Sequence, residues 1–126
     1  MKLNPDCVRD ILLFVENSDS LQIHFNDLCD GLTAYESKDI QYTCLKLKEA
    51  GYLTVVTKRY VNDDMDKVAI IKDIKFDGHN FLDSIRDVST WDKVKAASKK
   101  AGISLSSVLQ IANMAGNIAS NVSKLI

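Results

Sequence analysis

The sequence has little of what metal sites, disulfide-rich domains and secreted proteins are built from. Its 126 residues include three cysteines, two histidines and one proline, and no two cysteines form a CxxC pair. An odd number of unpaired cysteines argues against a disulfide framework and favours a reducing, cytoplasmic setting. No cysteine lies at metal-ligand spacing from a histidine. We therefore expect free thiols that act as small hydrophobic side chains and no metal site.

The signatures of common enzymes and of membrane insertion are also missing. The chain has no GxSxG, no HExxH and no glycine-rich phosphate loop. Its N-terminus lacks the apolar segment of a signal peptide, and asparagines interrupt the apolar C-terminal stretch. The acidic run at Asp63, Asp64 and Asp66 lacks the glycine and the closing glutamate of a calcium loop. These absences predict a non-enzymatic cytoplasmic protein without cofactor and without membrane attachment.

A strong basic excess is absent as well, since the net charge is −1. A protein that binds nucleic acid usually carries a clear positive excess. The hydrophobic fraction of 46% is nevertheless enough for one compact core. The charge is uneven, with an acidic excess in residues 1–50 and a basic excess in residues 51–126.

A helix is predicted through residues 78–87, after its N-cap Asp77. Before it, hydrophobic periodicity and turn signals predict six elements. They are a helix at 5–17, a strand at 21–25, helices at 26–31 and 38–50, and strands at 52–60 and 67–76. The order α-β-α-α-β-β predicts an α+β fold, a winged helix-turn-helix, in residues 1–88. Residues 89–126 are expected to add a C-terminal helical extension, with helices from Ser89 and Ser104.

Several residues are expected to begin or end these helices. Asn4 followed by Pro5 is a helix start, and Gly51 is a helix stop. The strand at 21–25 is expected to turn Leu21, Ile23 and Phe25 to the core. The predicted N-caps of the later helices are Asn26, Ser37, Asp77 and Ser89.

The run "FDGHNFLDSIRDVSTWDKVK" carries a family resemblance. The matching residues are Phe76, Gly78, His79, Phe81, Leu82, Ile85, Arg86, Asp87 and Trp91, and "MKLNPDCVRDILL" and "LKLKEAGYL" also fit. Over about residues 1–100 the chain resembles the YjcQ-like group of small proteins from Gram-positive bacteria and their prophages. The resemblance implies a cytoplasmic winged-helix-like protein and carries over no catalytic residue. The spacing itself indicates a structural role, with an apolar helix face that includes Phe76, and with Arg86 and Asp87 as ion-pair formers.

The helix at 38–50 occupies the place of a recognition helix. Its core face is expected to hold Ile40, Cys44 and Leu47. The outward residues are the candidate DNA contacts, with Gln41 and Thr43 for base edges and lysines for phosphates: Lys38, Gln41, Tyr42, Thr43, Lys46 and Lys48. Residues 36–53 contain no arginine, and their basic and acidic side chains balance. An ordinary solvated helix face is the open alternative.

Two further basic groups are candidate phosphate contacts. Lys58 and Arg59 precede the hairpin loop, although the acidic loop itself is expected to repel phosphate and suits a basic protein partner. Lys93 and Lys95 belong to a lysine-rich stretch whose alternative role is to keep a helix face soluble.

The end of the chain shows an apolar seam at helical spacing. Its residues are Val108, Ile111, Ala112, Ala115, Ile118, Ala119, Val122 and Leu125. This helix is expected either to pair with its copy in a homodimer or to fold back on its own domain. The sequence therefore predicts a small phage- or prophage-associated regulator that binds duplex DNA as a dimer. The alternative is an interaction module that uses the same scaffold on a host or phage protein.

Overall fold

The computed structural model describes the backbone of residues 3–62, 64 and 66–101, and the side chains of these residues up to 96. The chain divides into two compact units, Met1–Gly78 and His79–Ile126, and each is described by itself. The predicted boundary at residue 88 stays a prediction. The C-terminal seam from Val108 to Leu125 lies outside the described residues.

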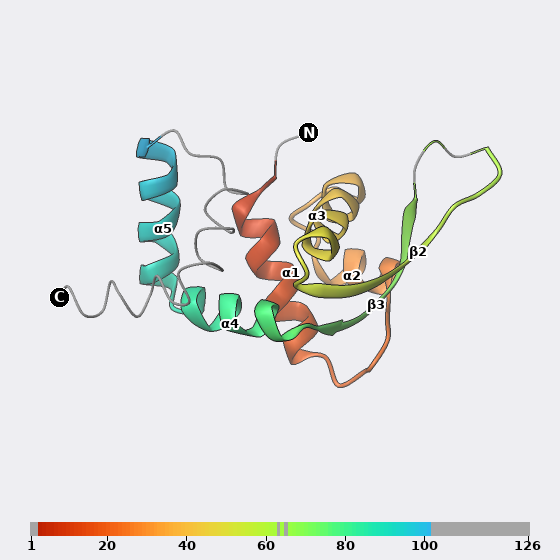
Figure 1. The fold of residues 1–126 in the computed structure, drawn as a ribbon, viewed down its shortest axis with the longest axis horizontal. Helices are drawn as coiled ribbons and strands as arrows, with labels where there is room; N and C mark the ends of the chain where they lie inside the picture. Colours follow the sequence, from red (N-terminus) through yellow and green to blue (C-terminus); the bar gives the residue numbers. More distant parts are fainter. Residues whose placement is uncertain (1–2, 63, 65, 102–126) are drawn as a thin grey trace. The chain divides into compact units, whose positions relative to one another are not determined.

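The first unit combines three helices with a small antiparallel sheet (Figure 1). Its elements are α1 (Pro5–Asn17), β1 (Ile23–His24), α2 (Phe25–Gly31), α3 (Ser37–Glu49), β2 (Leu53–Lys58) and β3 (Lys67–Ile74). The strand order is β1-β3-β2, so the central strand is β3. The predicted order of elements and the pairing of the short first strand with the hairpin are confirmed, and the fold is mixed α+β.

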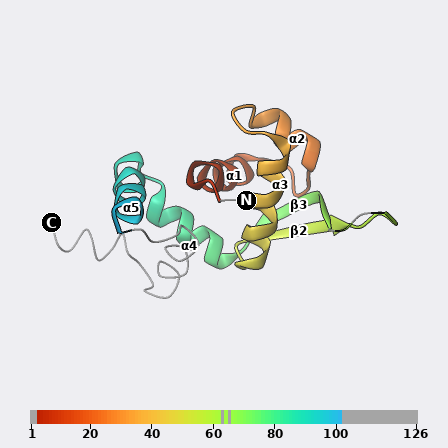
Figure 2. The ribbon, with the colours of Figure 1, turned by 90° about the horizontal axis from the view of Figure 1, so that it is seen from above.

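The core of this unit lies between the helices and the sheet. Figure 2 shows α1, α2 and α3 together on one side of β2 and β3. Helix α1 contacts α3 and β3, and α3 contacts β2 and β3. The buried side chains recur at i, i+3, i+4 and i+7 on α1 and α3 and meet apolar strand residues: Val8, Ile11, Leu12, Val15, Ile40, Cys44, Leu47, Leu53, Val55, Val68, Ile71 and Ile74.

Local capping explains where α1 begins and α3 ends. The Asn4 side chain accepts hydrogen bonds from the backbone N–H groups of Asp6 and Cys7, at 3.0 and 3.4 Å. After α3, Gly51 takes a φ of +80°, a conformation that favours glycine. Its N–H donates to the carbonyl of Lys48, and the N–H of Tyr52 donates to the carbonyl of Leu47. Both sequence signals are confirmed.

The sequence predictions for the first strand and for the caps of α2 and α3 are wrong. The strand at 21–25 is only Ile23–His24, because β3 pairs with it at two positions. Leu21 is 85% exposed, and Phe25 is the first residue of α2, so the cap position belongs to His24 rather than Asn26. Helix α3 likewise begins at Ser37 itself, with Glu36 in the cap position and no side-chain cap bond. The alternation of apolar and polar residues at 21–25 does not show how many of these residues pair with β3.

Helix α4 (Phe76–Ile85) spans the boundary between the units, and α5 (Val88–Ala101) belongs to the second. Phe81, Leu82, Ile85 and Trp91 are buried as predicted, but Phe76 is 79% exposed and does not join the apolar face.

The predicted cap residues near these two helices also shift. Asp77 lies in the first turn of α4 instead of capping it. The carboxylate of Asp87, ahead of α5, accepts the N–H of Ser89 at 3.2 Å. Arg86 forms its ion pair with Asp83, at 2.8 Å.

Near the start of α4, Gly78 packs so closely against its neighbours that a larger residue would not fit. A Cβ on Gly78 would overlap the carbonyl oxygen of Tyr52 and lie 2.7 Å from the Ile74 side chain. Close packing at Gly78 is confirmed. No helix within the described part of the chain combines the length and apolarity needed to cross a membrane.

Candidate nucleic-acid interface

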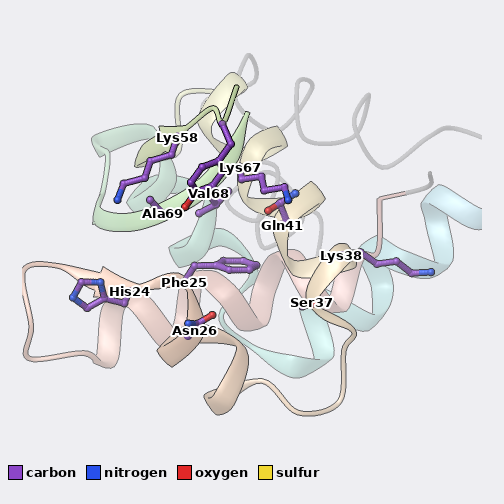
Figure 3. Close-up of a pocket in the computed structure, with 11 residues that line it drawn as sticks. His24, Phe25, Asn26, Ser37, Lys38, Gln41, Lys58, Lys67, Val68 and Ala69 are labelled. Atoms are coloured by element: carbon purple, nitrogen blue, oxygen red, sulfur yellow. The ribbon is translucent and has the colours of Figure 1, made fainter. Parts of the chain in front are cut away.

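An open groove of about 520 Å³ runs along one side of the first unit (Figure 3). It lies between the start of α2, the first turns of α3 and the loop-proximal ends of β2 and β3. The described residues that line it are His24, Phe25, Asn26, Ser37, Lys38, Gln41, Lys58, Tyr60, Lys67, Val68 and Ala69. In Figure 3 the Phe25 ring lies between His24 at one end and Lys38 at the other.

The short first strand is what leaves this groove open. Strand β1 pairs with β3 only at Ile71 and Ile70, and the chain then turns into α2 at Phe25. The first residues of β3, from 67 to 69, therefore have no strand beside them on the β1 side and line the groove instead. The early end of β1, which departs from the sequence prediction, thus leaves room for the groove.

The groove concentrates positive charge. Lys58 and Lys67 are directly opposite each other at the end of the β2–β3 ladder. Directly opposed side chains point to the same face, and like charges in such a pair destabilise a sheet. Lys38 adds a third cation, and none of the described residues that line the groove is aspartate or glutamate. The groove is therefore suited to an anion such as a phosphate.

The outward face of α3 is less basic than its lysines suggest. Lys38 pairs with Glu36 at 3.2 Å, and Lys46 pairs with Glu49 at 3.1 Å. The bond and charge of Glu49 raise the pKa of Lys46. The amine of Lys46 also lies 5.6 Å from the centre of the Tyr42 ring. Such exposed pairs contribute little to stability, so a phosphate can compete for either lysine.

Thr43 does not belong to the outward face, and its predicted contact with base edges is wrong. Its side chain is 1% exposed, and its hydroxyl donates to the backbone carbonyl of Asp39 at 2.7 Å. This bond to the preceding turn satisfies the hydroxyl inside the core, as serine and threonine often do in helices.

The other candidate residues fall outside the groove. Tyr42, Lys46 and Lys48 lie further along α3, and Arg59 is held by Asp66 across the hairpin at 3.1 Å. In the second unit, the amine of Lys95 lies 3.7 Å from Asp92 and 5.8 Å from the Trp91 ring centre. Lys93 is exposed on α5. The structure thus brings together only Lys38, Gln41 and Lys58 of the predicted contacts.

The sequence prediction missed most of the groove. The lining residues that it did not propose are His24, Phe25, Asn26, Ser37, Tyr60, Lys67, Val68 and Ala69. A signal was present for Lys67, since a hairpin closed by the polar segment 61–66 places it near Lys58. No comparable signal marks Phe25, because its position depends on where β1 ends.

The thiols and carboxylates of the described residues suggest no further chemistry. Burial raises the pKa of Cys44, and burial is also the main cause of the raised pKa values of Cys7 and Cys29. Thiols with raised pKa values are weak nucleophiles at neutral pH. Within the described ranges, no three His, Cys, Asp or Glu side chains are placed to hold a metal ion.

Comparison with known proteins connects the chain to one family. Residues 2–104 match the family model described as "Hypothetical protein (DUF2513)". A protein of Haemophilus influenzae, described as "Uncharacterized protein", is 31% identical over 114 residues, which cover 89% of this chain and 92% of that protein. No solved structure matches the chain.

Proposed function

The chain belongs to the DUF2513 family, and from this premise we propose that it is a non-enzymatic regulator that binds duplex DNA with a winged-helix scaffold. Helix α3 acts as the recognition helix, and the groove beside it holds the sugar–phosphate backbone of one strand. Association with phages and dimerisation through the C-terminal seam complete the proposal.

The observation that carries it is the opposed pair Lys58 and Lys67 in a groove whose described lining residues include no aspartate or glutamate. The two lysines supply positive charge at one end of the ladder, and a phosphate in the groove can bind either of them. Lys38 reaches the same groove from α3. Contacts of this kind position a protein on DNA without reading its sequence.

Gln41 supplies a group that can read bases. Its side chain lines the groove and makes no hydrogen bond to another described residue. A glutamine amide pairs with the N6 and N7 atoms of adenine in the major groove. Tyr42 and Lys46 follow on the same helix and are available for a longer contact.

Fluorescence anisotropy with a labelled random-sequence duplex tests this proposal. We expect micromolar binding at about 50 mM salt that weakens strongly at 200 mM. Replacing Lys58 by glutamine should lower the slope of log affinity against log salt by about one. Lys72→Gln is the matched control, because Lys72 is exposed on β3 but does not line the groove. Binding that is absent, or equal in both variants, would refute the proposal.

A protein partner is the second candidate function, favoured by the hairpin loop. Val61 is fully exposed and Tyr60 is 62% exposed, while Arg59 is already paired with Asp66. Exposed apolar side chains beside acidic ones suit a protein surface better than a phosphate backbone. If Val61→Ser abolishes capture of a host protein while DNA binding is absent, this second function replaces the first.

A further inference from the structure

The groove contains more than phosphate binding requires, because two aromatic rings lie among its cations. Phe25 is half-buried, and Figure 3 shows its ring in the middle of the lining residues. Tyr60 enters the same groove from the end of the hairpin ladder and is 62% exposed. Both rings therefore keep surface that solvent or a ligand can reach.

Three other aromatic side chains of the first unit have structural roles that Phe25 does not share. The Phe14 ring packs where Gly31 has no side chain. Tyr35 donates its hydroxyl to the Asp10 carboxylate at 2.6 Å, and Tyr52 is 1% exposed in the core. In contrast, the first residue of α2 places its ring in the groove, where packing within the unit leaves it half-exposed.

Aromatic rings between lysines are the combination that binds unpaired nucleotides. Lysines hold the phosphates, and a base stacks its flat face on the ring. Inside a duplex the faces of the bases are covered by their neighbours, so a protein reaches only their edges. A ring in the groove can therefore stack only on a base that has left the duplex.

We propose that the groove binds an unpaired nucleotide of a DNA strand next to a duplex, stacked on Phe25 and Tyr60, with its phosphate held by the lysines that line the groove. This inference rests on the proposed DNA binding and names the form of DNA that is bound. The volume of about 520 Å³ lies within the usual range of small-ligand sites.

Polar side chains in the same groove give the base a partner for its edge. Gln41 and Asn26 offer amides, and Ser37 offers a hydroxyl. None of these three side chains hydrogen-bonds to another described residue. Amides and hydroxyls are the groups that read the pairing edge of an exposed base.

The test compares two labelled duplexes of the same sequence, one blunt and one with a short single-stranded overhang. Anisotropy titrations of the full-length chain should give roughly tenfold tighter binding to the overhang. Phe25→Leu keeps an apolar side chain of similar size but removes the ring, and should bring the ratio of the two affinities close to one. Tyr60→Leu should do the same at a more exposed position, where the replacement disturbs the core less.

Phe76→Leu is the matched control. Phe76 is 79% exposed, lies outside the groove and undergoes the same replacement, so this variant should keep the wild-type ratio. Equal, salt-sensitive affinity for both duplexes would overturn the inference and leave the proposed duplex binding standing. A preference for the overhang that survives both groove variants also overturns it. Binding to the overhang alone supports the inference and rejects the blunt duplex as target, and binding to neither rejects both.

Discussion

The two faces of α3 differ in how closely their neighbours constrain each side chain. On the inner face, Ile40, Thr43, Cys44 and Leu47 are at most 1% exposed and meet α1 and the sheet. On the outer face, Lys38 and Lys46 form ion pairs with exposed glutamates, and the Gln41 side chain hydrogen-bonds to no other described residue. The inner face is therefore expected to set stability, and the outer face is free to set binding.

Replacing Leu47 by alanine should have the largest effect on stability. The side chain is 1% exposed, so its loss leaves a cavity and should lower the free energy of unfolding by about 2–5 kcal/mol. Lys48→Ala, the next residue on the outer face, should change it by less than about 0.5 kcal/mol. Urea denaturation measures both. Similar values for the two variants would remove the contrast between the faces.

High pH should lower the free energy of unfolding through Tyr52, a buried residue shortly after the end of α3. Burial and the charge of Asp77 raise the pKa of Tyr52 to about 12 from its ordinary value of 10. The folded state thus holds the phenolic proton more tightly than the unfolded state does. Stability from this group is complete below pH 10 and is lost as pH rises to 12, by roughly 2–3 kcal/mol.

Denaturation curves between pH 9 and 12 provide the measurement for Tyr52. Tyr52→Phe removes the titrating group and should flatten this part of the profile relative to the wild type. An unchanged alkaline profile would show that the phenol is not the group responsible.

Thr43→Val should separate stability from binding. The variant loses the bond from the hydroxyl to the Asp39 carbonyl and should be destabilised by about 1 kcal/mol. Because Thr43 is buried, its DNA affinity, measured by anisotropy on the folded variant, should equal that of the wild type. Gln41→Ala should show the reverse pattern, with little change in stability and weaker binding. A loss of affinity in folded Thr43→Val would return this residue to the contact surface.

The smallest effect on stability is expected for Lys58→Gln, which should raise stability while it lowers DNA affinity. Lys58→Gln relieves the repulsion from Lys67 and should raise the free energy of unfolding by about 0.2–1 kcal/mol, while DNA affinity falls. Urea denaturation and anisotropy on the same preparation test both signs. A loss of stability and of affinity together would indicate that the lysine has a structural role instead.

Much of the first unit was predictable because its signals are local. Asn4 and Pro5 mark the start of α1, Gly51 marks the end of α3, and the apolar spacing of both helices identifies their buried faces. Thr43 also fits that spacing, three residues after Ile40. Its polar side chain suggested solvent, and only the bond to Asp39 in the folded helix explains its burial.

The groove was much less predictable. Lys38, Gln41 and Lys58 were proposed as contacts, but their meeting place depends on residues from separate elements. Lys67 becomes significant only through its register with Lys58, and Phe25 only because β1 stops at His24. Pairing between strands and the ends of strands are set by contacts between distant parts of the chain, which a single sequence does not display.

By itself the sequence determined the class of elements, their order and the buried faces of the helices, because backbone preferences and hydrophobic periodicity act over a few residues. Only the tertiary structure decided that β1 has two residues, that Lys58 lies opposite Lys67, and that Phe25 and Tyr60 enter one groove. Those outcomes follow from packing and strand register, where the free energy depends on partners far away along the chain.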